Sequence, residues 1–260
     1  MLDLAHQIHA SDGPETAPPL LIAHGLFGQA RNFATLAKRF AVGRRVVAVD
    51  MRNHGDSPWD SDVSYYAQAS DLARTIEAQC GGRAAVLGHS MGGKAAMELA
   101  TVYPERVADL IVADIAPVEY THTHAGYIAA MQGLDLGALT RRSEADALLA
   151  EAIPDKPVRQ FLLQNLAFEG GVARWRLNLA ALGAGMATLI GFPAFETRYQ
   201  GRALFLYGSA SDYVAPWTHS AIHTRFPEAR IEAIEGAGHW LHAERPEAFA
   251  KAVLDWLAKP

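Results

Sequence analysis

The segment that most constrains the fold is a short apolar run that ends in a glycine-bracketed serine. Residues Ala84 to Leu87 lead directly into Gly88-His89-Ser90-Met91-Gly92, and a run of helix-forming residues from Lys94 to Ala100 follows. This pattern predicts a buried strand, a sharp turn and a helix, with Ser90 at the apex of the turn. Glycines are needed on both sides because strand and helix approach too closely there for side chains. A serine in that place is typical of a nucleophile.

Apolar runs alternate with helical spacing over most of the chain. Leu4 to His9 alternates apolar and polar residues and predicts an early edge strand. Strands that alternate with helices at this spacing indicate a mostly parallel sheet flanked by helices, an α/β fold. Further strands are expected at Leu20–Ala23, Arg45–Val49, Leu110–Ala113, Ala203–Tyr207 and Ile231–Ile234.

The alternation stops between residues 118 and 195. We find no convincing strand there, whereas Glu144–Ala152, Val158–Leu166 and Trp175–Leu182 have helical spacing. A helical insertion in an α/β chain is expected to form a cap, or lid, over the sheet edge where ligands bind. We therefore expect an α/β core made of residues 1–117 and 196–260 and a helical cap made of residues 118–195.

Composition narrows the classes of partner. The 260 residues carry a formal net charge of -5 with no block of basic residues, so neither nucleic acid nor insertion into a membrane is indicated. A single cysteine, Cys80, excludes an internal disulfide and suits a reducing compartment. No signal peptide or membrane-spanning apolar run is visible. The expectation is a cytoplasmic protein whose partner is a small molecule; its oligomeric state does not follow from the sequence.

A serine hydroxyl needs a base within hydrogen-bond reach, and histidine suits this role at neutral pH. Among 11 histidines, His239 is the best placed. It stands in the glycine-bracketed loop Gly236-Ala237-Gly238-His239-Trp240 after the last expected strand, and it follows the serine in chain order as this type of fold requires. We predict that Ser90 and His239 are catalytic.

The acid that orients the histidine has two candidates. After the later strand, the spacing from Gly208 puts Ser211 at the usual acid position and Asp212 one residue late. Asp114 stands at the end of the earlier strand, where a catalytic acid can also lie. We favour Asp114 as the catalytic acid, keep Asp212 as the alternative, and expect Ser211 to face the histidine and the acid as a fourth member.

Acyl transfer also needs preorganised donors for an oxyanion. Met91, directly after the nucleophile, can supply one backbone N–H, and Leu26 in His24-Gly25-Leu26-Phe27-Gly28 can supply a second. We predict an oxyanion hole made of these two amides. Phe27, Trp175 and Trp240 are expected to line the substrate pocket. His122 and His124 lack further ligands at metal-site spacing, so we expect solvent-exposed cap residues, no metal and no cofactor.

These motifs together resemble the α/β-hydrolase superfamily over essentially the whole chain. The closer likeness is to ybfF-type bacterial esterases and their mitochondrial hydrolase-domain relatives. It lies in the serine and oxyanion motifs above and in three further segments: Asp50-x-Arg52-Asn53-His54-Gly55-x-Ser57-Pro58, Asp114-Ile115-Ala116-Pro117 and Ser211-x-Tyr213-Val214. That group also places serine at the later-strand acid position and uses the earlier aspartate, so the resemblance supports Asp114. It implies hydrolysis of short to medium acyl esters and, in some members, of acyl-CoA thioesters.

The sequence therefore predicts a serine hydrolase that cleaves carboxylic esters through an acyl-enzyme. Two alternatives share the fold, a cofactor-free haloperoxidase (perhydrolase) and a hydrolase of carbon–carbon bonds. A third belongs to another class, a non-catalytic ligand-binding protein on a hydrolase scaffold. Acyl-chain length and the choice between ester and thioester depend on how the cap packs, which helical spacing does not give.

Overall fold

The computed structural model describes residues 1–193 and 197–259. Within these residues the largest unit is a seven-stranded sheet with the order β1-β3-β2-β4-β5-β8-β9. β1 runs antiparallel to β3 at one edge, and the other neighbours are parallel. The expected mostly parallel sheet is confirmed. Its strands are β1 (His6–His9), β2 (Leu20–Ala23), β3 (Val46–Val49), β4 (Ala84–His89), β5 (Val107–Ala113), β8 (Ala203–Gly208) and β9 (Ala229–Ile234).

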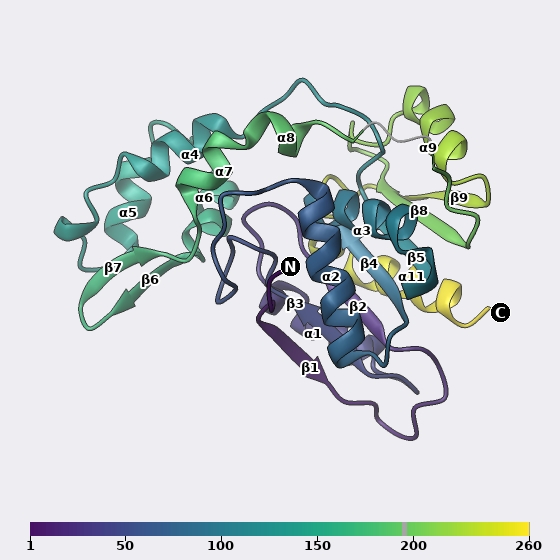
Figure 1. Ribbon diagram of the computed structural model, residues 1–260. Coiled ribbons are helices and arrows are strands. Elements are labelled where there is room, and N and C mark those ends of the chain that lie inside the picture. The colour runs from purple at the N-terminus through teal and green to yellow at the C-terminus, as the bar shows by residue number, and fades with distance from the viewer. Residues whose placement is uncertain (194–196, 260) are drawn as a thin grey trace.

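Helices cover both faces of this sheet (Figure 1). The central strands are apolar on both faces, and each face has its own buried cluster: α1 and α11 close one cluster, and α2, α3 and α9 close the other. The sheet is thus packed from both sides. The helices are α1 (Ala34–Phe40), α2 (Tyr65–Gln79), α3 (Met91–Val102), α9 (His219–Arg225), α10 (Leu241–Glu244) and α11 (Pro246–Leu257), with short 3-10 turns at Ala30–Phe33, Pro104–Arg106 and Pro216–Thr218.

A separate group of elements lies between β5 and β8. In Figure 1 it stands to one side of the sheet, and α8 leads back toward the core. We use the word cap for these elements and the loops that join them. They are α4 (Ala125–Gln132), a 3-10 turn at Leu136–Ala138, α5 (Arg142–Leu149), α6 (Lys156–Leu163), β6 (Leu166–Glu169), β7 (Val172–Trp175), α7 (Leu179–Ala184) and α8 (Met186–Ile190).

The prediction of a cap without strands is wrong in one place. β6 and β7 form an antiparallel hairpin, and its turn contains Gly170 and Gly171, both at positive φ (60° and 83°). Two glycines that accept positive φ favour a tight two-residue hairpin turn. Trp175 consequently ends a strand instead of starting a helix, and the helix expected from Trp175 begins only at Leu179.

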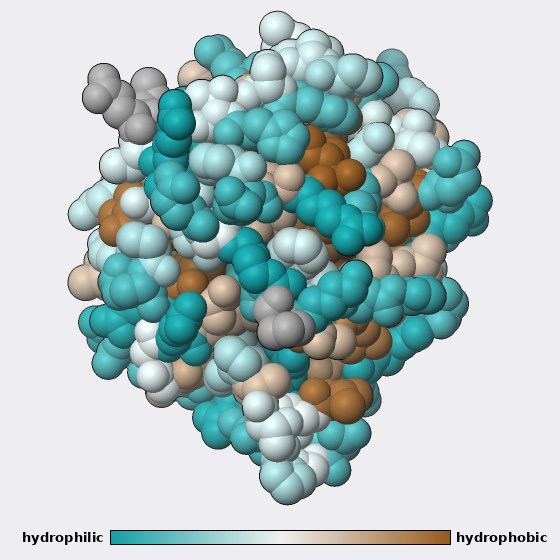
Figure 2. Space-filling view, turned by 90° about the vertical axis from the view of Figure 1, so that its right-hand side faces the viewer, coloured by the Kyte–Doolittle hydropathy of each residue, from teal (hydrophilic) through white to brown (hydrophobic). Residues whose placement is uncertain are grey.

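The limits of core and cap stay proposals. The expected boundary between residues 195 and 196 lies outside the described residues. No helix in the described ranges is both long enough and apolar enough to cross a membrane. On the face shown in Figure 2, apolar side chains form small patches separated by polar ones.

Candidate active site

Ser90 lies at the sharp turn between β4 and α3. Its backbone has φ 53° and ψ -118°, a left-handed conformation that residues with side chains rarely adopt. The flanking glycines are required by close packing. A Cβ on Gly88 would lie 2.2 Å from the carbonyl oxygen of Gly92, and one on Gly92 would lie 2.4 Å from that of Ala23. The turn holds the hydroxyl at the carboxyl edge of the sheet.

His239 reaches Ser90 from the loop after β9. Its Nε2 lies 3.1 Å from Ser90 Oγ, and the ring of Tyr213 stacks on the imidazole at a centroid distance of 4.0 Å. The N–H of Gly238 donates to the carboxylate of Glu244 at 2.7 Å, which ties the loop to the end of α10. The stacking of Tyr213 and the hydrogen bond from Gly238 to Glu244 together hold the imidazole of His239 next to Ser90.

Asp114 holds the other side of the imidazole. It is fully buried at the end of β5, and its Oδ2 lies 2.7 Å from His239 Nδ1. A carboxylate accepts hydrogen bonds, so Nδ1 carries the proton and Nε2 is free to accept the proton of Ser90. Asp114 also accepts from the Gly208 N–H at 3.0 Å and from Ser211 Oγ at 2.5 Å. Asp212 is exposed and takes no part in this chain of contacts.

The two predicted oxyanion amides lie beside Ser90. Met91 is the first residue of α3, where a backbone N–H has no partner within the helix. The Leu26 N–H donates no hydrogen bond within residues 1–193 and 197–259. A Cβ on Gly25 would lie 3.0 Å from Ser90 Cβ, so only glycine lets this loop approach the serine so closely. Both amides are available to a negatively charged oxygen.

Buried imidazoles support the loop around Leu26. The Met51 N–H donates to His24 Nε2 at 2.9 Å, and His24 Nδ1 donates to the Gly25 carbonyl at 2.8 Å. Burial lowers the pKa of His24 to about 4, so the ring is neutral at physiological pH and keeps Nε2 as an acceptor. His24 therefore ties the loop down, as the sequence indicates.

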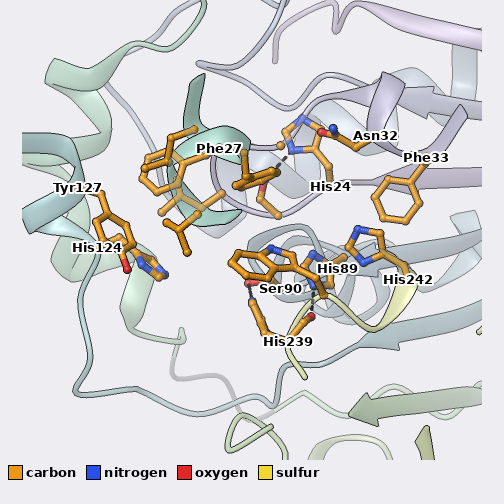
Figure 3. Close-up of a pocket in the computed structure, with 17 residues that line it drawn as sticks. His24, Phe27, Asn32, Phe33, His89, Ser90, His124, Tyr127, His239 and His242 are labelled. Carbon is orange, nitrogen blue, oxygen red and sulfur yellow. Dashed lines mark hydrogen bonds between the residues drawn. The ribbon is translucent and has the colours of Figure 1, made fainter. Parts of the chain in front are cut away.

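Two small cavities meet at Ser90, and Leu26 and His124 also line both. The first chamber has a volume of about 60 Å³ and the second one of about 40 Å³. Figure 3 shows the first chamber, with His124 and Tyr127 of the cap across from His89 and His242 of the core. Besides these, the first chamber is lined by Phe27, Phe33, Val158, Phe161, Leu162, His239 and Trp240. The second is lined by Tyr65, Met91, Lys94, Ile115, Tyr120, His122, Met186, Leu189, Ile190 and Tyr213.

Two of the three residues predicted to line the substrate pocket lie at the first chamber, and the third does not. Phe27 and Trp240 line the first chamber, but Trp175 lines neither and its prediction is wrong. Its side chain is buried within the cap, where Nε1 donates to the Met131 carbonyl at 3.2 Å. The physical reason is the unforeseen hairpin, which turns Trp175 toward the cap interior.

Sequence reasoning also missed three residues that line the chambers, two from the cap side and one from core helix α3. His124 was expected in solvent, yet its ring lies at both chambers, and burial lowers its pKa to about 4. Phe161 of α6 faces the Trp240 ring at 5.8 Å. Lys94 is buried and lines the second chamber, one helical turn after Ser90. For Lys94 a signal existed, since a residue four places after an apical serine lies on the same helix face.

Comparisons with known proteins identify the family of this chain. The model of the "Alpha/beta hydrolase family" matches residues 20–252. The chain is 44% identical over 256 residues to an sn-1-specific diacylglycerol lipase, ABHD11, of Mus musculus, covering 95% of this chain and 83% of that one. It is 37% identical to esterase YbfF of Escherichia coli, with 92% of each covered. A solved marine microorganism esterase superposes with a TM-score of 0.92 at 35% identity, covering 98% of this chain and 99% of that chain. The chain therefore belongs to the α/β-hydrolase family and lies close to the ybfF-type esterases.

Proposed function

We propose that the protein is a serine hydrolase that cleaves carboxylic esters through an acyl-enzyme on Ser90. One observation carries the proposal: Ser90 Oγ, the imidazole of His239 and the Asp114 carboxylate form a continuous hydrogen-bonded chain, with contacts of 3.1 and 2.7 Å. The names of the relatives, a diacylglycerol lipase and an esterase, support ester cleavage.

In the proposed mechanism Ser90 Oγ attacks the ester carbonyl and gives its proton to His239 Nε2. Asp114 stabilises the imidazolium and holds its tautomer. The N–H groups of Leu26 and Met91 bind the oxyanion. The tetrahedral intermediate then collapses, and the leaving alcohol takes the proton from Nε2. In the second half, Nε2 takes a proton from water as the water oxygen attacks the acyl carbonyl. The acyl–Oγ bond then breaks, Nε2 returns the proton to Ser90 Oγ, and the carboxylic acid leaves.

We assign the acyl group to the first chamber because apolar side chains such as Phe27, Phe161 and Leu162 dominate its wall. The leaving group then lies toward the second chamber, which is lined by Tyr120, His122 and other polar side chains. A single water needs roughly 10–15 Å³ of such space. A cavity of about 60 Å³ therefore fits a short acyl chain, and a medium chain fits if the cap shifts. Thioesters of similar acyl length fit the same scheme, and the cytoplasmic location stays a prediction.

The test combines turnover with covalent labelling. Ser90→Ala should lower kcat for 4-nitrophenyl butyrate by about 10⁶. A fluorophosphonate probe should label the natural protein at Ser90 and leave the variant unlabelled. Hydrolysis by Ser90→Ala at the natural rate would remove the nucleophile assignment. Absence of both turnover and labelling in the natural protein would favour a ligand-binding role. Acyl-CoAs of matched chain length, assayed on the same preparation, measure the preference between ester and thioester.

A further inference from the structure

The segment Arg52-Asn53-His54 has no part in the mechanism above, yet it contacts the loop that carries Leu26. That loop needs support, because the next residue, Phe27, has φ 64° and would relax if nothing held it. Rotation of the peptide groups on either side of Leu26 would turn its N–H away from the oxyanion. The hydrogen bonds that hold Phe27 therefore determine the orientation of the Leu26 N–H, one of the two proposed oxyanion donors.

His54 grips the N–H of Phe27. The side chain is fully buried, and its Nε2 accepts from the Phe27 N–H at 3.1 Å. Its Nδ1 donates to the Arg52 carbonyl at 2.8 Å, which leaves Nε2 without a proton and able to accept. Burial lowers the pKa of His54 to about 3, so the ring stays neutral across the working range. His54 lines neither chamber, so it acts through Phe27 and does not touch the substrate.

The cap forms a hydrogen bond with the carbonyl of Phe27. Asn165, buried between α6 and β6, donates from Nδ2 to the Phe27 carbonyl at 2.8 Å. Its Oδ1 accepts from Gln29 Nε2 at 2.6 Å, and its own carbonyl accepts from the Arg176 N–H at 2.8 Å. Every polar group of the Asn165 side chain is thus engaged with the loop or with the cap. The orientation of Phe27 depends on a core residue and a cap residue together.

The 52–54 segment is itself fastened to the cap. Asn178 donates to Asn53 twice at 3.0 Å, from its backbone N–H to the carbonyl and from Nδ2 to the side-chain oxygen. His54 forms an isolated antiparallel bridge with Leu177. On the core side, Arg52 forms a buried ion pair with Asp71 at 2.8 Å. The position of His54 is therefore set by both units.

We propose that His54 is a positioning residue for the oxyanion hole, and that Asn165 couples the placement of the cap to the same hole. This inference rests on the proposed function. His54 of the core holds the N–H of Phe27 and Asn165 of the cap holds its carbonyl, and this clamp of two hydrogen bonds fixes the direction of the Leu26 amide. A displaced cap loosens the clamp, so the oxyanion hole is complete only when the cap is seated.

The experiment compares four variants with the natural protein. His54→Leu removes the acceptor, His54→Gln offers a side-chain oxygen in its place, and Asn165→Leu removes the cap contact. Arg31→Met is the matched control, because it loses a cap–core hydrogen bond of 2.6 Å, from the exposed Arg31 guanidinium to the Gln164 carbonyl, and within the described residues Arg31 has no hydrogen bond to Phe27 or to residues 52–54. The substrates are 4-nitrophenyl butyrate and its thiono analogue, in which sulfur replaces the carbonyl oxygen. Sulfur accepts hydrogen bonds poorly, so the ratio of the two kcat values reports on the oxyanion donors.

His54→Leu should lower kcat for the oxygen ester by about 10²-fold, as loss of one oxyanion donor does, with KM changed by less than about threefold. The oxygen-to-sulfur ratio should fall by at least about tenfold. His54→Gln should recover most of both values, Asn165→Leu should lose about tenfold in kcat, and Arg31→Met should stay near the natural protein.

A fall in kcat with an unchanged oxygen-to-sulfur ratio would overturn the inference, since a purely structural defect does not change that ratio. Retained kcat in a folded His54→Leu protein would do the same. If His54→Leu does not fold, Asn165→Leu decides by the same two values. Failure of the proposed function has a separate signature, because the natural protein itself would then neither turn over the oxygen ester nor react with a fluorophosphonate.

Discussion

The core and the cap contribute different things to the site. Ser90, Asp114 and His239 follow the carboxyl ends of β4, β5 and β9, so the sheet places the reacting groups. His124 and Phe161 come from the cap and form walls. A sheet edge holds a few atoms in fixed geometry, whereas helices that lie over it set the size and polarity of a cavity. Under the proposed function, the reaction depends on the core and the choice of substrate on the cap.

Hydrogen bonds from core side chains to backbone carbonyls of the cap join the two units. Lys94 of α3 donates from Nζ to the carbonyls of Ile190 and Gly191 at 2.8 and 2.5 Å, at the end of cap helix α8. Tyr65 of α2 donates from its hydroxyl to the Leu189 carbonyl at 2.7 Å. The last carbonyls of a helix lack partners within it and attract positive charge. Side chains of the core therefore bind the carboxyl end of α8, and one of them, Lys94, belongs to α3, the helix that follows Ser90.

The largest effect is expected from replacing Asp114, the proposed catalytic acid at the end of β5 in the core. Asp114→Asn should lower kcat by about 10⁴, because an amide at this position no longer holds the imidazole in the reactive tautomer. Asp212→Asn is the matched control and should leave kcat unchanged, since that side chain is exposed. Steady-state rates with 4-nitrophenyl butyrate measure both. A near-normal Asp114→Asn protein would refute our assignment of the acid.

A smaller effect within the core half is expected from Ser211. Its hydroxyl donates to the same Asp114 oxygen that accepts from His239. Ser211→Ala removes one charge-assisted hydrogen bond, so kcat should fall by about tenfold. Ser211→Thr keeps a donor and should lie between alanine and the natural residue. Equal rates for serine and alanine would show that the other contacts of Asp114 suffice to hold it.

A substitution in the cap is expected to change the preferred acyl-chain length and to leave the rate of ester cleavage nearly unchanged. Phe161→Ala should enlarge the first chamber, so the preferred 4-nitrophenyl ester should shift from the shorter members of an acetate, butyrate, octanoate and laurate series toward the longer ones. The rate with butyrate should change by less than about threefold, because no reacting group moves. Removal of the half-buried Phe161 ring leaves space that a longer chain can fill. An unchanged preference with intact rates would place the acyl chain in the other chamber.

The smallest effect is expected on stability and concerns Lys94, which joins core helix α3 to cap helix α8. Burial lowers the pKa of Lys94 to about 7, whereas an unfolded lysine titrates near about 10.4. Between these values the unfolded state binds more protons than the folded state, so this residue makes stability rise with pH. Lys94→Met removes that rise.

The difference in unfolding free energy, natural minus Lys94→Met, should therefore increase by about 1–2 kcal/mol from pH 7 to pH 9. Urea unfolding at several pH values measures it. Lys38→Met, at an exposed site, is the control and should give no such trend. A constant difference for Lys94→Met would mean that this ammonium keeps its proton throughout that range.

The fold and the core half of the site could be predicted because their signals are local. The elbow needs glycines at fixed places around Ser90, and each strand end marks its own loop. Asp114 and His239 lie 125 residues apart in the sequence, yet both follow strands whose carboxyl ends must share one edge. Parallel pairing converts separate local patterns into one site.

The cap half could not be predicted because its contacts depend on packing between distant segments. Asn165 reaches Phe27 across 138 residues, and no periodicity marks either as a partner of the other. Trp175 has helical spacing with its neighbours, but the adjacent pair Gly170 and Gly171 decides for a hairpin. A double glycine between alternating residues was the available signal, and it outweighs spacing over so short a stretch.

Within the described ranges, four residues other than glycine have positive φ: Phe27, Asn53, Ser90 and Asp114. Each such backbone costs about 1–3 kcal/mol, and all four lie at the site or at its joint with the cap. Replacing them by glycine would relieve the cost and remove the side chains or the clamp that the site uses. Attempts to raise the melting temperature should therefore leave these turns alone and work on surface helices and loops, where stability can be gained without loss of turnover.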